Sequence, residues 1–431
     1  MDDAEAARLA ARVREETRHA WRGYMKHARG HDALKPLSKK PHDWYPQSLL
    51  MTPVDALDTL ILMGLNDEAA EARGLIATRL SFDQDMPVQN FEVTIRLLGG
   101  LLSGYQLTGD KKLLELADDL GTRLLPVFES PTGLPYTHVS LRTGVASGKV
   151  SNPAETGTLL LEFGTLSKLT GKPIYYDKAK RALVATFERR SKIGLVGSAI
   201  DVETGEWTDR NSHVGGGIDS YYEYLLKCWK LFGDEDCKRM WEQSVVPMNR
   251  HLADELGGGE LWYGHADMDS GVRGASRYGA LDAFLPAVLA LAGDIDRASR
   301  LQKSGLAMWR LHGIEPEALD YRKMEVISGG YQLRPEIIES AYYLHHLTGD
   351  QRWRAMGREF FDDFERNCRT DTAYAAIKDV RTMEKRDSME SFLLAETFKY
   401  YWLLFSPPSA LEFDGVVFNT EAHPLRRTWK D

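Results

Sequence analysis

Apolar positions along the chain recur in blocks that end at glycine. Stretches such as TIRLLGGLLSGYQL and TGTLLLEFGTLSKL run to a glycine that is often followed by aspartate. Glycine just past a helix supplies a left-handed cap, and the aspartate after it can begin the next helix. The endings lie at Gly64, Gly109, Gly171, Gly233, Gly293 and Gly349, with spacings of 45, 62, 62, 60 and 56 residues. A period in this range predicts stacked pairs of helices.

The two helices of each pair differ in polarity. The stretch before each glycine is apolar on most sides, whereas the stretch after it is charged, as in DQRWRAMGREFFDDFERN. Inner helices are predicted at 52–64, 91–108, 155–170, 219–232, 280–292, 336–348 and 389–405. Seven inner helices that alternate with outer ones predict an all-α (α/α)7 barrel, a single domain over residues 1–431. An open solenoid is the alternative, but it needs polar capping repeats, and the sequence shows none.

The composition limits the kinds of partner and of metal site that the protein is expected to have. The net charge of −9 argues against nucleic acid or an anionic membrane surface as the main partner. No apolar run reaches the ~18 residues of a membrane span, and the acidic, then amphipathic N-terminal stretch is not a signal peptide. The compartment stays open. Cys228, Cys237 and Cys368 form no Cys-x-x-Cys pair, so we expect neither a zinc site nor a disulfide framework.

Acidic residues occupy the first turns of the predicted inner helices. They are Asp55, Asp58, Glu92, Glu155, Asp219, Asp282, Glu336, Glu339 and Glu390. Capping and the helix dipole explain any one of them. Parallel inner helices, however, would bring all of them to one mouth of the barrel, beside Arg96 and Arg334. Such a group suits acid–base chemistry on a neutral polyol, because glycoside hydrolysis needs two carboxyl groups with different roles.

Long motifs carry a resemblance to a known family. TPVDALDTLILMGL, FEVTIRLLGGLLSGYQLTGD, DSYYEYLLK, YQLRPEIIESAYYLHHLTGD, MESFLLAETFKYYWLLFS and VFNTEAHPL span nearly the whole chain. The sequence resembles the class I α-mannosidases, glycoside hydrolase family 47. The resemblance implies an (α/α)7 barrel, which agrees with the helix count. It also implies calcium-dependent hydrolysis of terminal α-1,2-linked mannose with inversion.

The resemblance assigns roles to individual residues. It implies that Glu92 is the general acid and Glu336 the general base. Asp219 matches a third essential carboxylate, which is the acid in some interpretations of the family mechanism. Positions around the sugar or the metal match Arg96, Glu155, Arg334, Glu339, Phe392, Glu396 and Glu421. Phe392 would stack under the mannose ring.

The segment VVFNTEAHPL at 416–425 takes its meaning from the same resemblance. Thr420 matches the Ca²⁺ ligand, giving a backbone carbonyl and a hydroxyl oxygen. Calcium takes six to eight oxygen ligands, so water and two sugar hydroxyls would complete its shell. We expect a short C-terminal β-hairpin that plugs the barrel from the end opposite the substrate mouth, with Thr420 at its tip. For His423 we expect a structural hydrogen bond.

The chain departs from the family pattern at its fifth inner helix. Ala280 and Ala283 stand at the family's His and Cys positions. We therefore expect the family disulfide to be absent, which suits a bacterial or reducing origin. The missing His removes a sugar-facing group, and His265 or Asp269 is the candidate replacement.

These observations favour a calcium-dependent, inverting exo-α-1,2-mannosidase, which we expect to act as a monomer on mannose-containing oligosaccharides. A non-catalytic mannose-glycan-binding protein on the same scaffold is the first alternative, although all three catalytic carboxylates are retained. A barrel glycosidase that acts on another sugar is the second. Thr420 weighs against it, because the metal would read the axial 2-hydroxyl of mannose. The natural glycan is not determined by the sequence.

Overall fold

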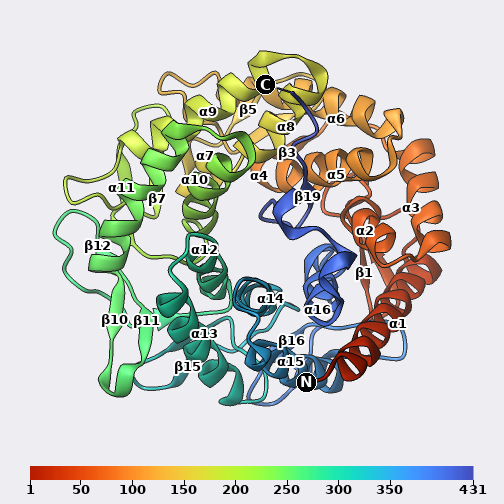
Figure 1. The fold of residues 1–431 in the computed structure, drawn as a ribbon. Coiled ribbons are helices and arrows are strands. Elements are labelled where there is room, and N and C mark those ends of the chain that lie inside the picture. The colour runs from red at the N-terminus through yellow and green to blue at the C-terminus, as the bar shows by residue number, and fades with distance from the viewer. Residues whose placement is uncertain (431) are drawn as a thin grey trace.

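The computed structural model of the protein describes residues 1–430, in which inner and outer helices alternate around a ring (Figure 1). The inner ring runs through α2 (Met51–Leu62), α4 (Asn90–Val93) with η1 (Thr94–Leu98) and α5 (Gly99–Thr108), α7 (Pro153–Gly157) with α8 (Leu160–Thr170), α10 (Asp219–Phe232), η4 (Leu281–Phe284) with α12 (Leu285–Leu291), α14 (Glu336–Thr348), and η5 (Leu393–Thr397) with α16 (Phe398–Phe405). The outer ring consists of α1 (Asp3–His27), α3 (Asn66–Arg79), α6 (Lys111–Leu124), α9 (Pro173–Glu188), α11 (Glu235–His251), α13 (Ile295–Arg310) and α15 (Gln351–Cys368).

Contacts between neighbouring helices close the ring. The first outer helix, α1, packs against α16 at the end of the chain, and α2 contacts η5. Each remaining outer helix packs against the inner helix that precedes it, as α9 does on α8 and α11 on α10. The large apolar side chains of the core, including Trp21, Trp309 and Trp353, are buried within these layers. This arrangement confirms the predicted (α/α)7 barrel.

The glycine–aspartate corners form the short turns from inner to outer helices. Gly109 and Gly171 have φ near +70° and cap α5 and α8 in the left-handed conformation, which glycine adopts without steric cost. Asp110, Asp234 and Asp350 then accept backbone hydrogen bonds as N-caps of the following helices. Both parts of the predicted corner are therefore confirmed.

The longer connections run from outer to inner helices and carry small antiparallel sheets, so these sheets surround the end of the barrel where the inner helices begin. They are β1 (Ala33–Lys35) with β2 (Lys40–His42); β3 (Pro87–Gln89), β4 (His138–Ser140) and β5 (Ala146–Ser147); β6 (Val150–Ser151), β7 (Ala199–Asp201) and β8 (Trp207–Asp209); β9 (Asn211–Ser212) with β12 (Ala266–Asp267); β10 (Ala253–Glu255) with β11 (Leu261–Tyr263); β13 (Arg277–Tyr278), β14 (Ala318–Asp320) and β15 (Glu325–Ser328); and β16 (Ile377–Asp379) with β17 (Glu384–Lys385). Short 3-10 turns complete the connections: η2 (Leu125–Phe128), η3 (Gly257–Gly259), η6 (Pro408–Ala410) and η7 (Phe413–Gly415).

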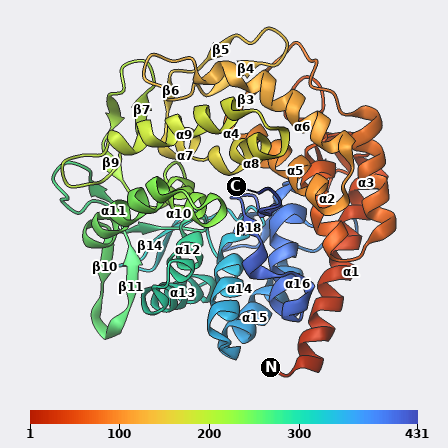
Figure 2. The same cartoon turned by 45° about the horizontal axis from the view of Figure 1, so that its top comes forward.

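A C-terminal hairpin lies inside the ring, as Figure 2 shows. Its strands, β18 (Val417–Phe418) and β19 (Pro424–Leu425), pair antiparallel. The chain beyond β19 bonds the carboxyl ends of the inner helices, where Gln106 exchanges hydrogen bonds with the backbone of Arg426. The turn between the strands points toward the helix N-termini, with Thr420 at its tip. The predicted plug from the end opposite the mouth is confirmed.

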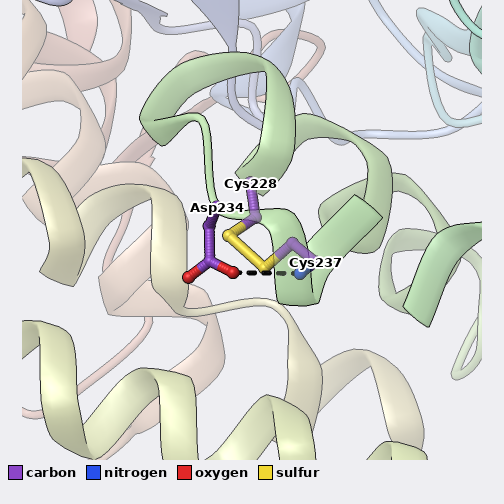
Figure 3. Close-up of side chains that lie close together, drawn as sticks. All are labelled: Cys228, Asp234 and Cys237. Atoms are coloured by element: carbon purple, nitrogen blue, oxygen red, sulfur yellow. Dashed lines mark hydrogen bonds between the residues drawn. A yellow bond between two sulfur atoms is a disulfide. The ribbon is translucent and has the colours of Figure 1, made fainter. Parts of the chain in front are cut away.

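The prediction that the cysteines form no disulfide framework was wrong. Cys228 and Cys237 are joined by a disulfide across the α10–α11 corner (Figure 3). The tight turn at Gly233 brings their Cα atoms to 5.9 Å, which lies within the disulfide range, although the two residues belong to different helices. Asp234 bonds the backbone N–H of Cys237 at 3.0 Å. Cys368 is a buried free thiol.

None of the described helices combines the length and the apolar character that spanning a lipid bilayer requires.

Candidate active site

A cavity of about 340 Å³ opens at the end of the barrel where the inner helices begin. All of the residues predicted to act in catalysis, sugar binding and metal binding line it: Glu92, Arg96, Glu155, Asp219, Arg334, Glu336, Glu339, Phe392, Glu396, Thr420 and Glu421. Sequence reasoning missed other lining residues, among them Gln89, Asn152, Glu223, Leu281 and Phe284.

The three predicted catalytic carboxyl groups come from three different helices. Glu92 lies in the first turn of α4, Asp219 is the first residue of α10, and Glu336 is the first residue of α14. Burial raises the pKa of Asp219 to about 7 and that of Glu336 to about 7, although Arg334 opposes the second shift. One oxygen of Glu336, Oε2, is buried without a hydrogen-bond partner. Two titratable groups with pKa values near neutrality therefore face one cavity.

Arg96 connects the carboxylates on one side of the cavity. Its Nε donates to Glu92 Oε2 at 2.8 Å, and its Nη1 donates to Glu421 Oε1. The same guanidinium group lies 5.0 Å from the centre of the Trp44 ring and 5.6 Å from that of Phe392. Arg96 thus lies close to two aromatic rings while it pairs with two carboxylates.

Arg334 also lies close to Phe392, 5.5 Å from its ring centre. Two of its nitrogens bond the carboxylate of Glu317, at 3.1 Å from Nε and 3.0 Å from Nη2. Glu317 lies in a connection, not at the start of an inner helix, so the helix pattern gave no signal for it. Phe392 therefore lies within reach of two immobilised guanidinium groups, with its ring lining the cavity.

A further group of carboxyl side chains lines the same cavity. Burial, with repulsion from neighbouring carboxylates, raises the pKa of Glu396 and of Glu339 well above the usual range. The pKa of Glu421 is also raised, by burial that Arg96 does not fully offset. Glu223 is paired with the buried amine of Lys227 at 2.6 Å. If all of these groups were ionised, this part of the site would carry more negative charge than Arg96 and Lys227 neutralise.

Thr420 lies among these carboxyl groups at the tip of the hairpin. Its backbone N–H donates to the Tyr224 hydroxyl at 3.2 Å. No described group hydrogen-bonds to its carbonyl or its hydroxyl, while the residue lines the cavity. Asn419 fixes the turn: its side chain donates to the Ile95 carbonyl at 2.9 Å and accepts from the His423 backbone at 2.8 Å. A buried turn thus presents two free oxygens of one residue to the cavity.

Two inner helices pass through π-helical turns beside the cavity. Thr94–Leu98 carries Arg96, and Leu393–Thr397 carries Glu396. Such turns insert one residue into a helix and are frequent at functional sites. The hydrophobic period of both segments is that of an ordinary α-helix, so these turns could not be predicted from it.

Asp55 and Asp58, predicted at the mouth, instead lie buried against the hairpin. The two ring nitrogens of His423 bond Asp58 Oδ2 at 2.6 Å and Asp55 Oδ1 at 3.1 Å. Lys399 Nζ pairs with Asp58 Oδ1 at 2.7 Å. The structural role predicted for His423 is confirmed. The two aspartates occur where α2 passes the hairpin, which is why they do not face the cavity.

Four more residues lie away from the predicted position. Asp282 is buried behind the glycine loop at 215–217, and burial raises its pKa to about 7. Glu390 faces a neighbouring cavity. His265 stacks on His213 at 4.6 Å, and Asp269 pairs with Arg210 on the surface at 2.6 Å. Neither of the last two lines the active cavity, so neither replaces the side chain missing at Ala280.

Glu315 was not singled out from the sequence. It is fully buried in the connection before β14, and both of its carboxyl oxygens are without a partner among the described residues. Burial and the nearby charge of Glu336 raise its pKa. A glutamate between Ile314 and Pro316 has no sequence signal that would predict complete burial.

Comparison with known proteins shows to which family this arrangement of residues belongs. Residues 16–427 match the profile described as glycosyl hydrolase family 47. The chain belongs to that family. It is 38% identical to alpha-mannosidase I MNS4 of Arabidopsis thaliana over 444 residues, 98% of this chain and 70% of that protein. It is 37% identical to the human endoplasmic reticulum mannosyl-oligosaccharide 1,2-alpha-mannosidase, covering 94% of this chain and 62% of that protein.

A solved relative shows the same architecture in three dimensions. The alpha-1,2-mannosidase from Trichoderma reesei superimposes with a TM-score of 0.89 and 28% sequence identity, over 97% of this chain and 99% of that one. Family membership confirms the prediction of a glycoside hydrolase. The predicted bacterial origin has no support, because these relatives come from a plant, a human and a fungus.

Proposed function

We propose that the protein is a calcium-dependent exo-α-1,2-mannosidase that releases terminal mannose from mannose-rich oligosaccharides with inversion. The observation that carries the proposal is the convergence of Glu92, Asp219 and Glu336 on one cavity whose floor is Thr420. The names of the relatives, mannosyl-oligosaccharide 1,2-alpha-mannosidase and alpha-1,2-mannosidase, give the linkage.

Glu336 acts as the general base. Ionised Glu336 accepts a proton from water, and that water attacks the anomeric carbon. The free Oε2 is the atom available for this hydrogen bond. Arg334, two residues earlier in the sequence and fixed by Glu317, favours the ionised form of the base and opposes the effect of burial on its pKa.

The acid donates a proton to the leaving oxygen, and two carboxyl groups are candidates. Burial raises the pKa of Asp219 to about 7, which favours the protonated form that an acid needs. Glu92, bonded to Arg96, would act through a water molecule, as the family resemblance implies. The carboxyl separation expected for an inverting enzyme is roughly 6.5–9.5 Å, which leaves room for the attacking water.

The residues present fit calcium. Hard cations bind oxygen ligands, and the site offers the free carbonyl and hydroxyl oxygens of Thr420 beside buried carboxyl groups that a bound cation would allow to ionise. Thr420 would hold the ion directly, and Glu421, Glu396 and Glu339 would hold its water molecules. When bound, calcium supplies positive charge that orients two sugar hydroxyls.

The shape of the site suits a terminal sugar. The hairpin closes the barrel floor, so a chain end enters and a mid-chain unit does not. Phe392 lines the cavity and offers its ring to the ring of the sugar, and the nearby Arg96 and Arg334 offer hydrogen-bond donors. We also propose that the protein works as a monomer, because one chain supplies every residue of the cavity.

The test is to offer α-1,2-mannobiose to the folded protein with calcium and with a chelator, and to follow the products by proton NMR. We expect release of mannose that first appears as the β-anomer, and loss of turnover with the chelator that calcium restores. A folded protein that releases no mannose at any calcium concentration would refute the proposal. Release of the α-anomer first would refute inversion alone.

A further inference from the structure

A second cavity, of about 640 Å³, lies beside the active cavity. We call it the side cavity and define it by His42, Trp44, Tyr45, His138, Arg386 and Glu390, which line it. Its walls come from the β1–β2 hairpin, the segment 386–390 after β17, and the β3–β4 pair. All three belong to connections at the mouth of the barrel.

The partition between the two cavities is thin. Gln89 lines both of them. Its side-chain amide donates to Glu155 Oε1 in the active cavity at 2.9 Å, and its backbone N–H donates to the Tyr45 hydroxyl at 3.1 Å. Trp44 lines the side cavity while its ring covers Arg96 of the active site. A ligand that leaves the active cavity past Gln89 therefore meets the side cavity next.

The walls are fixed without a ligand. Asp387 accepts backbone hydrogen bonds from Leu37 at 2.8 Å and Ser38 at 3.2 Å, which ties the segment 386–390 to the β1–β2 turn. Leu34 and Met389 form a β-bridge between the same segments. A preformed cavity lowers the entropic cost of ordering the protein around a ligand.

The chemistry of the lining suits a neutral polyol. Lys35 and Arg386 are balanced by Asp387 and Glu390, so the cavity has no strong preference for one sign of charge. Trp44 and Tyr45 offer aromatic surface with polar edges. The exposed guanidinium group of Arg386 makes no hydrogen bond or ion pair with any described residue, so its donors are free for a ligand.

We propose that the side cavity binds a mannose unit of the substrate beyond the disaccharide that contains the bond to be cleaved. The inference rests on the proposed function. The active cavity, at about 340 Å³, has room for that disaccharide and little more, because pockets that hold small ligands begin at ~300 Å³. A longer branch extends past Gln89 and Trp44 into the side cavity, where Arg386 donates to its hydroxyl groups.

The experiment compares kcat/KM for α-1,2-mannobiose and for a mannose-rich oligosaccharide, in the wild-type protein and in Arg386→Ala. We expect the value for the oligosaccharide to fall about fivefold or more, as for the loss of one hydrogen bond to a charged donor, and the value for mannobiose to stay within about twofold. Arg22→Ala is the matched control, since Arg22 on α1 is also exposed and has no side-chain partner among the described residues.

Equal effects of Arg386→Ala on both substrates, or no effect on the oligosaccharide, would overturn the proposal. Calorimetric titration of the same oligosaccharide into Glu336→Gln, with and without Arg386→Ala, repeats the comparison without turnover. An inactive wild-type protein would therefore count against the proposed function, whereas unchanged oligosaccharide affinity in Arg386→Ala would count against the side cavity.

Discussion

His423 is the residue through which stability and pH are most directly connected. It is fully buried between Asp55 and Asp58, with Lys399 on the far side of Asp58. Burial alone would lower its pKa, but the two carboxylates outweigh burial and raise it from 6.5 to about 9. His423→Gln removes the positive charge while it keeps a hydrogen-bonding side chain of similar size.

The size of the effect follows from that pKa. A change from 6.5 to about 9 corresponds to about 3 kcal/mol of stabilisation by the protonated ring. Because the folded pKa lies above the unfolded one, this stabilisation is complete below pH 6.5 and is lost as the pH rises through about 9. The difference in unfolding free energy between wild type and His423→Gln should therefore be largest near pH 6.5 and narrow by about 3 kcal/mol toward pH 10.

The assay is urea-induced unfolding followed by tryptophan fluorescence between pH 6.5 and 10, at one calcium concentration. His213→Gln is the matched control, because burial lowers the pKa of His213 to about 3 and its ring stays neutral over this range. The difference in unfolding free energy between His213→Gln and the wild type should change by less than about 0.5 kcal/mol over this pH range. A difference for His423→Gln that is constant, or that grows with pH, would refute the assignment of a charged His423.

Two further predictions concern catalysis and the disulfide. Glu336→Gln should lower kcat for mannobiose at least about 100-fold, because a general base contributes that much, while calorimetry finds sugar binding retained; full turnover would remove Glu336 from this role. Replacing Cys228 and Cys237 by serine should lower the unfolding free energy by about 2.5 kcal/mol, as expected for a crosslink across nine residues, with kcat unchanged. Dithiothreitol should destabilise the wild type and not this variant; equal responses would contradict the prediction.

The helices could be predicted because their signals are local. The apolar runs and the glycine–aspartate corners predicted helices at 219–232 and 336–348, and both helices have these bounds in the structure. The small sheets could not be predicted in this way, because most of their strands have two or three residues, too few for an alternating pattern to show. The disulfide was missed for a related reason: nine residues separate its cysteines, and only the angle between α10 and α11 brings them together.

The site could be predicted where each residue lies at the start of an inner helix. Glu92, Asp219 and Glu336 follow that rule, and the family resemblance added Thr420, which obeys no helical pattern. Trp44 and Glu317 were missed because each lies in a connection and acts on the site by holding an arginine. The prediction for Asp55 and Asp58 was wrong because these residues, although they lie near the start of an inner helix, contact the hairpin and not the mouth of the barrel.

The position of the hairpin also explains how the site is completed. The ring of helices supplies the carboxylates, but its floor is the last folded segment of the chain. Arg96 bonds Glu92 in the cavity, and through Nη1 it contacts both Glu421 of the hairpin and, at 3.4 Å, Asp55, which in turn bonds His423. The groups that fasten the hairpin are therefore continuous with the groups that face the sugar. A change that loosens the first set must also displace the second, so Thr420 can occupy its position only when the closed ring and the final hairpin are both in place.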